Sequence, residues 1–271
     1  MTLDFLIDPF REPTGLRALI EISMLGVAGG AVGTWVVLYR LSYAAESLAH
    51  GLLPGLVIAA LAGFPLLLGG VVGLIVAAVA VVFATQVEEI DRETAIGVVV
   101  TFLLGLGVLF ALSPQTPAGL NELLFGDILG TTDGDLVLAA ALAVVAVFAT
   151  GLLGPRFTLV GFDRSYAVSA GVNPVAIDFT VVLLIAAVLL VAVQGLGNLL
   201  VVAVLVGPPA AARLLTNRVS PMMFVAAATA VVAGFVGLVA SYHLQIASGA
   251  TVTLSFVAAY GLAALARRRL V

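Results

Sequence analysis

The sequence predicts an all-α bundle of transmembrane helices, with eight or nine spans in a single domain over residues 1–271. Hydrophobic residues make up 62% of the chain and charged residues only 10%, whereas soluble domains carry about 25% charged residues. Several long segments contain no ionisable side chain, and their hydrophobicity is continuous. Continuous apolar runs of about 20 residues are typical of membrane helices, while alternating hydrophobicity would indicate barrel strands.

Each predicted span follows from an apolar run and from the residues that interrupt it. The run from residue 51 to residue 87 breaks at Gly63–Pro65. A second long run offers breaks at Gly195, Gly197 and Pro208–Pro209. The nine predicted spans are Leu16–Leu38, Glu46–Ala62, Leu66–Ala84, Thr94–Leu112, Asp135–Leu153, Val175–Val193, Leu196–Leu215, Met222–Ala240 and Gly249–Ala266. The number falls to eight if one of them is re-entrant or broken.

Arginine predicts the orientation, because lysine is absent and the positive-inside rule then depends on arginine alone. With nine alternating spans, one side of the membrane receives Arg40, Arg92, Arg156, Arg164, Arg213, Arg218 and Arg267–Arg269. Only Arg11 and Arg17 fall on the other side. We therefore expect a multi-pass plasma-membrane protein with a cytoplasmic C-terminus. Residues 1–15 are expected to be extracellular or to lie along the membrane surface.

The composition also excludes several functional classes. Cysteine is absent, so the chain has neither a disulfide framework nor a thiolate metal site. Phosphate-loop, nucleophile-elbow and zinc-protease motifs are missing as well. We expect no enzyme activity and no nucleic-acid partner, and any ATP must be hydrolysed by another chain.

Glu46 and His50 stand out because they are ionisable, four residues apart, and flanked by long apolar runs. Positions i and i+4 share one face of a helix. Ionisable groups at membrane depth are costly and often functional. The pair predicts a metal contact on a transport path, since imidazole and carboxylate suit zinc, manganese or ferrous iron. A self-satisfied intrahelical pair, or a helix start at the cytoplasmic interface, is the alternative.

A short capped helix is predicted in the cytoplasmic loop 160–172. Asp163 is a plausible N-cap, and Gly171 is suited to a left-handed residue after the helix. The turns between them would present Arg164, Tyr166 and Ala167 to a partner. An ordinary surface connector is the alternative.

Three acidic residues and the second histidine fall on the predicted outer side. Glu122, Asp127 and Asp133 could dock a delivery protein or simply solvate a loop. His243 follows the predicted span ending at Ala240, so it is expected in an extracellular loop, either as a metal acceptor or as a solvated residue. Elsewhere, small-residue faces such as Gly26–Gly30 permit close helix packing, either within the chain or between two copies.

A series of motifs in a fixed order covers nearly the whole chain. They are Leu38–Tyr43, Glu46–Gly55, Glu93–Gly97, Leu124–Leu129, Phe162–Val172, Leu199–Ala203, Pro209–Leu215 and Ser248–Thr251. In these motifs the chain resembles the permease subunits of ABC importers for zinc, manganese or iron. Glu46 stands where the family usually has Asp, and Ala49 stands where it usually has Ser. Gln245 and Ala247 occupy places that often hold Asp and Pro.

The resemblance implies both partners and roles. Such permeases pair with a second copy of themselves, with the pathway between the copies. Cytoplasmic ATPase subunits dock on the loop 160–172, which the resemblance identifies as the coupling helix, and an extracytoplasmic receptor delivers the ion. The transported Zn, Mn or Fe ion is cargo, and no permanent cofactor is implied. Two other functions remain open, a secondary carrier using Glu46 and His50 as a proton relay and a non-transporting scaffold.

Overall fold

The computed structural model describes residues 2–84, 89–112, 128–197 and 201–270. In this part of the chain every regular element is a helix. The elements are α1 (Thr2–Ile7), η1 (Asp8–Phe10), α2 (Pro13–Leu38), α3 (Ser42–Ala62), α4 (Leu66–Ala84), α5 (Arg92–Ala111), η2 (Ile128–Gly130), α7 (Asp133–Phe162), α8 (Arg164–Ser169), α9 (Pro174–Leu196), α10 (Val201–Leu215), α11 (Val219–Leu244) and α12 (Ser248–Leu270). The all-α membrane bundle expected from the sequence is confirmed.

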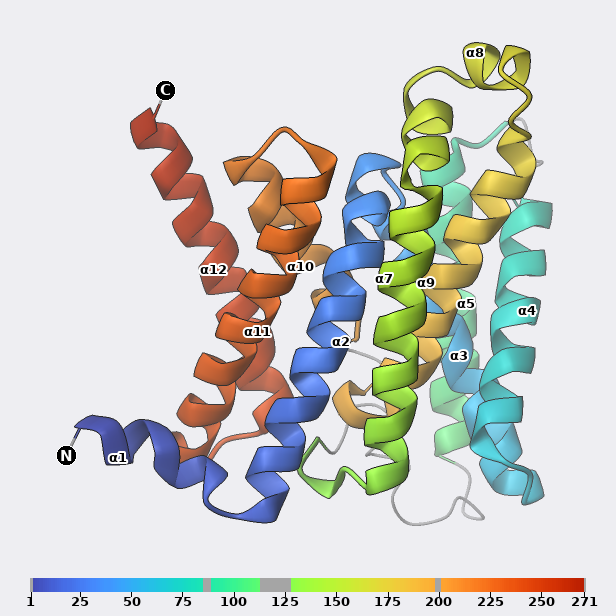
Figure 1. Ribbon diagram of the computed structural model, residues 1–271. Coiled ribbons are helices and arrows are strands. Elements are labelled where there is room, and N and C mark those ends of the chain that lie inside the picture. The colour runs from blue at the N-terminus through green and yellow to red at the C-terminus, as the bar shows by residue number, and fades with distance from the viewer. Residues whose placement is uncertain (1, 85–88, 113–127, 198–200, 271) are drawn as a thin grey trace.

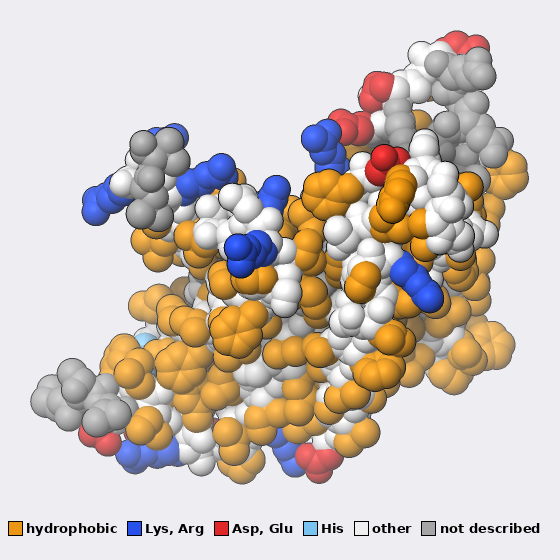
Figure 2. Space-filling view, turned by 45° about the horizontal axis from the view of Figure 1, so that its top comes forward, with side chains coloured by type: hydrophobic (Ala, Val, Ile, Leu, Met, Phe, Trp, Pro, Cys, Tyr) orange, Lys and Arg blue, Asp and Glu red, His pale blue; other side chains and the backbone are white. Residues whose placement is uncertain are grey.

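The long helices run side by side, and α1 lies across the foot of the bundle (Figure 1). The C-terminus and α8 lie at one end, and the N-terminus lies at the other. Hydrophobic side chains cover the flank in Figure 2, while charged side chains gather towards the two ends. Large apolar residues such as Phe102, Phe148 and Phe224 are exposed on the surface of the helices. An apolar belt between charged ends is the surface that a lipid bilayer requires.

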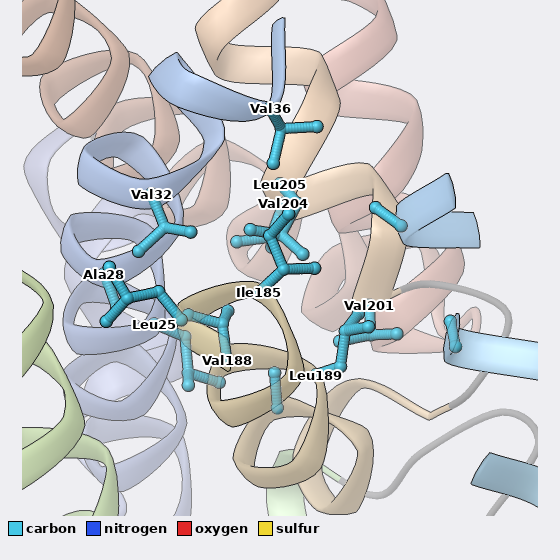
Figure 3. Close-up of a cluster of buried hydrophobic side chains, with 14 of the residues drawn as sticks. Leu25, Ala28, Val32, Val36, Ile185, Val188, Leu189, Val201, Val204 and Leu205 are labelled. Atoms are coloured by element: carbon cyan, nitrogen blue, oxygen red, sulfur yellow. The ribbon is translucent and has the colours of Figure 1, made fainter. Parts of the chain in front are cut away.

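Helix α2 is the centre of the bundle and packs against α7, α9, α10 and α11. Figure 3 shows the core where it meets α9 and α10. Its buried positions Leu25, Ala28, Val32 and Val36 repeat at helical spacing along one face. They form one buried cluster with side chains of α9 and α10, which close packing of the three helices requires.

The glycines of α2 bring two neighbouring helices to backbone contact. A Cβ at Gly30 would lie 2.6 Å from the backbone nitrogen of Ala227 in α11. A Cβ at Gly33 would lie 2.1 Å from the carbonyl oxygen of Leu205 in α10. Packing within the chain therefore accounts for these small-residue faces.

The number of spans differs from the expectation. In the described ranges, seven helices are long and apolar enough to cross a membrane, and two shorter apolar helices cover Leu66–Val81 and Val201–Leu215. The expected eight or nine spans are thus a slight overcount. Helix α10 has 15 residues, which rise about 23 Å, less than the hydrocarbon thickness of about 30 Å.

Two helices are also longer than expected. Helix α7 continues past Leu153 to Phe162 and contains Pro155 in its interior. Proline removes one backbone hydrogen bond, yet α7 continues through it. Helix α11 continues past Ala240 to Leu244.

Candidate functional site

Helix α3 holds Glu46 and His50 on one face, as the spacing predicts. His50 Nε2 lies 3.9 Å from Glu46 Oε1. The His50 side chain is 11% exposed and the Glu46 side chain 48% exposed. The residues between them, Ser47 to Ala49, are buried. The imidazole of His50 is therefore more deeply buried than the carboxylate of Glu46, which lies at the surface of α3.

A cavity of about 410 Å³ lies beside Glu46. It lies between α3, α10 and α12, and its lining consists of Ser42, Tyr43, Glu46, Val202, Ala203, Val206, Gly207, Phe256 and Val257. Glu46 is the single charged residue in this lining. A carboxylate at the mouth of an otherwise apolar cavity attracts a cation, because few competing polar groups surround it.

The backbone of α3 is unusual one turn after the pair. Pro54 has no N–H to donate to the carbonyl of His50, so the helical hydrogen-bond ladder is interrupted there. Gly55 then lets α4 approach, since a Cβ on it would lie 2.2 Å from the carbonyl oxygen of Gly69. The site thus sits at an irregular point of α3 that is backed directly by the α4 backbone.

The described residues of one chain do not form a complete metal site. No group of three or more His, Cys, Asp or Glu residues converges anywhere in the described part of the chain. Structural zinc sites use four ligands, and catalytic zinc sites use three. Glu46 and His50 alone offer two side-chain donors. Further donors must come from backbone, water or another copy of the chain.

The predicted short helix at the end opposite the N-terminus is present as α8. The Tyr166 N–H donates a 2.8 Å hydrogen bond to Asp163 Oδ1, so Asp163 is the N-cap. Gly171 has a φ of +76°, the left-handed conformation expected after the helix. Arg164 pairs with Asp178 of α9 and thereby ties α8 to the bundle.

The surface of α8 is partly apolar. Ala167 is fully buried against the bundle, whereas Tyr166 and Val168 are 61% and 62% exposed. Phe162, at the end of α7, is 80% exposed. Exposed aromatic side chains on a projecting helix are typical of a protein docking surface. Of the three residues predicted to be presented there, Ala167 is thus turned inward.

His243 is not in a loop, contrary to the expectation, because α11 continues to Leu244. Its ring stacks on Phe5 with centroids 3.6 Å apart, and its Nε2 lies 2.7 Å from the Phe5 carbonyl oxygen. The histidine thus holds the N-terminal helix α1 against α11.

The predicted acidic docking residues are only partly described. Glu122 and Asp127 lie outside the described residues. Asp133 begins α7, is 80% exposed, and lies 2.8 Å from Arg17 Nη2. It sits at the end of the bundle opposite α8.

Sequence reasoning missed Glu21, which is 2% exposed and lies near the start of the first predicted span. Its carboxylate contacts the Thr131 hydroxyl, 110 residues away in sequence. The signal was available, since an acid inside a long apolar run is costly and demands a partner. The partner itself was not visible, because Thr131 lies among ordinary polar loop residues.

A helical bundle with an apolar belt, and with a carboxylate–imidazole pair of which Glu46 lines a cavity, has the build of a transport permease. The chain belongs to the ABC 3 transport family, whose model matches residues 13–267. It is 31% identical over 238 residues to the manganese transport system membrane protein MntC of Listeria monocytogenes, covering 88% of this chain and 85% of that protein.

A second relative and a solved structure are also similar to this chain over most of its length. A probable iron transport system membrane protein of Haemophilus influenzae is 28% identical over 251 residues, covering 93% of both chains. The fold is similar to a chain of PsaBC from Streptococcus pneumoniae, solved in complex with Fab, with a TM-score of 0.88 and 24% identity. That match covers 97% of this chain and 95% of the other. The chain is therefore a membrane permease of the ABC transporter type.

Proposed function

We propose that this chain is the permease subunit of an ATP-driven importer for a divalent transition-metal ion. The observation that carries the proposal is the Glu46–His50 pair beside the cavity between α3, α10 and α12. The similarity to manganese and iron transport proteins favours manganese or ferrous iron as cargo, with zinc as the third candidate. An imidazole nitrogen and a carboxylate oxygen suit all three ions.

A second copy of the chain completes the metal pathway in this proposal. Two ligands from each copy make four when the two cavities face each other across the dimer. Water fills the remaining coordination positions. Such incomplete coordination serves transport, because an ion that binds too tightly is not released.

A separate ATPase supplies the energy, and it docks on α8 in this proposal. The exposed Tyr166 and Val168 fit a groove on that partner, while the Arg164–Asp178 ion pair transmits movement to α9. The α8 end and the C-terminus then lie in the cytoplasm. The opposite end, with Asp133, receives the ion from an extracytoplasmic receptor.

Transport by the complex in vesicles tests the proposal. The permease is reconstituted with its ATPase and receptor, and ATP-dependent uptake of manganese is measured. The double variant Glu46→Ala/His50→Ala should assemble normally and lose uptake to the background level. The control Glu12→Ala changes an exposed glutamate outside the site and should retain uptake. Normal uptake by the first variant overturns the site, and uptake without the ATPase identifies a secondary carrier instead.

A further inference from the structure

Glu21 is a buried carboxyl group that the proposed metal path does not use. It lies one turn after Arg17 on α2 and is 2% exposed. Its Oε2 forms a hydrogen bond with Thr131 Oγ1. A Cβ at Gly195 would lie 2.4 Å from Glu21 Oε1. The carboxyl group therefore joins three elements: α2, the residues after η2, and the last turn of α9.

Counting hydrogens shows which form of Glu21 fits this arrangement. Thr131 Oγ1 also lies 2.6 Å from the carbonyl oxygen of Ile128, which can only accept. A threonine hydroxyl carries one hydrogen. If Glu21 were ionised, its Oε2 and the Ile128 carbonyl would both be acceptors, competing for that one hydrogen. If Glu21 carries a proton, it donates to Thr131, which donates to Ile128, and every contact is satisfied.

The charged groups around Glu21 also favour its protonated form. Arg17 is on the same helix but is paired with Asp133 at 2.8 Å. Asp135 at the start of α7 adds a second negative charge that acts on Glu21. From α9 the contact is Gly195, in a final turn that presents backbone carbonyl oxygens. Among the described residues no cation lies within ion-pair distance of Glu21, and an isolated buried carboxylate is costly.

We infer that Glu21 is a proton-binding site, and that the bound proton ties α2 to Thr131 and to the end of α9. The site acts as a latch at the end of the bundle opposite α8. Ionisation removes the donated hydrogen bond and leaves a buried carboxylate against the last turn of α9. The latch is therefore closed at low pH and weakens as the pH rises. This inference does not depend on the proposed transport function.

Thermal unfolding of the purified permease across pH tests the inference. Glu21→Gln keeps the size of the side chain and supplies a permanent N–H donor to Thr131. The wild type should match this variant near about pH 5 and fall several degrees below it in Tm by about pH 9. Glu12→Gln, which changes an exposed glutamate at the start of α2, should follow the wild type. A Glu21→Gln variant that is less stable than the wild type at every pH overturns the inference.

Infrared spectroscopy gives a direct second readout. The wild type should show the carbonyl band of a protonated carboxylic acid, and Glu21→Gln should lack it. The wild type and Glu21→Gln could have equal Tm at all pH values. In that case a carboxylic-acid band that persists in the wild type at every pH supports a Glu21 that stays protonated throughout. The absence of that band overturns the proton-binding site. If Glu21→Gln does not fold, Thr131→Val should shift the band because it removes the acceptor, while Thr131→Ser should leave it in place. A band unmoved in Thr131→Val overturns the inference.

Discussion

Glu21 and Glu46 are the same side chain in two consecutive long helices, yet their surroundings are opposite. Glu46 is about half exposed, borders a cavity, and has an imidazole as its neighbour. Glu21 is sealed from solvent, with a threonine hydroxyl and the backbone of α9 against it. The comparison teaches that residue type supplies a carboxyl group, whereas packing decides what it can bind. An accessible carboxylate can exchange a metal ion, and a sealed one keeps a proton.

The largest expected effects come from removing each carboxyl group in turn. Glu46→Ala should abolish metal uptake in vesicles while changing Tm little, because its side chain is half exposed and its pairing with His50 is long, at 3.9 Å. Glu21→Ala should lower stability by about 1–3 kcal/mol, because Thr131 loses its partner and a void remains. Uptake and thermal unfolding are measured on the same preparations. If Glu46→Ala failed to fold, Glu46 would be a structural residue like Glu21, and the proposed difference between the two carboxyl groups would be wrong.

A steric test sharpens the comparison on the Glu21 side. Gly195→Ala places a Cβ 2.4 Å from Glu21 Oε1 and should cost about 1–3 kcal/mol. Gly151→Ala in α7 is the matched control, since nothing lies within 4 Å of its added Cβ. In a Glu21→Ala background the cost of Gly195→Ala should disappear, because the clashing atoms are gone. Thermal unfolding of the four proteins in this cycle gives the coupling, and simple additivity would contradict the contact.

Two aspartate caps extend the comparison to the α8 end. Asp163→Ala should cost α8 about 1 kcal/mol and reduce metal-transport coupling, measured as uptake per ATP hydrolysed. Asp91→Ala removes the equivalent cap from α5, where the side chain accepts from the Thr94 N–H at 3.0 Å. In the Asp91→Ala variant, metal uptake per ATP hydrolysed should stay at the wild-type value. Equal loss in both variants would show that α8 has no special part in coupling.

The Asp91 cap also has a defined pH dependence. Hydrogen bonds from the Thr94 hydroxyl and N–H hold the pKa of Asp91 below its usual value. A lowered folded-state pKa stabilises the protein at neutral pH, and this contribution is lost as the pH falls through that pKa. The α5 cap and the Glu21 latch should therefore fail at opposite ends of the pH range. Hydrogen exchange of the first turn of α5, measured against pH, checks the cap.

The smallest expected effect is at the ion pair beside Glu21. Arg17 and Asp133 are 41% and 80% exposed, so solvent screens their attraction. Arg17→Ala should change stability by no more than about 0.5 kcal/mol. A larger loss in thermal unfolding would mean that the surface pair, and not the Glu21–Thr131 contact, holds this end together.

Much of the fold was readable from local patterns. Long apolar runs located the helices. A segment that lies in lipid must pair its backbone N–H and C=O groups with one another, and a helix does this. The capped helix α8, with Asp163 and Gly171 at its ends, followed from residue preferences that act within one turn. The shared face of Glu46 and His50 followed from helical spacing.

Other features depend on contacts between distant segments. Pro155 lies inside α7, although its ring removes one backbone hydrogen bond from the helix. His243 belongs to a helix and meets Phe5, which is 238 residues away in sequence. No local pattern encodes either outcome, since each depends on which helices become neighbours.

By itself, the sequence determined a membrane bundle, the places of its helices, and a carboxylate–imidazole pair on one helix face. Only the tertiary structure decided that Glu46 borders a cavity between α3, α10 and α12, and that Glu21 is sealed against Thr131 and Gly195. The physical reason is range. Helical periodicity acts over one or two turns, whereas burial and hydrogen-bond partners are set by side chains that only packing brings together.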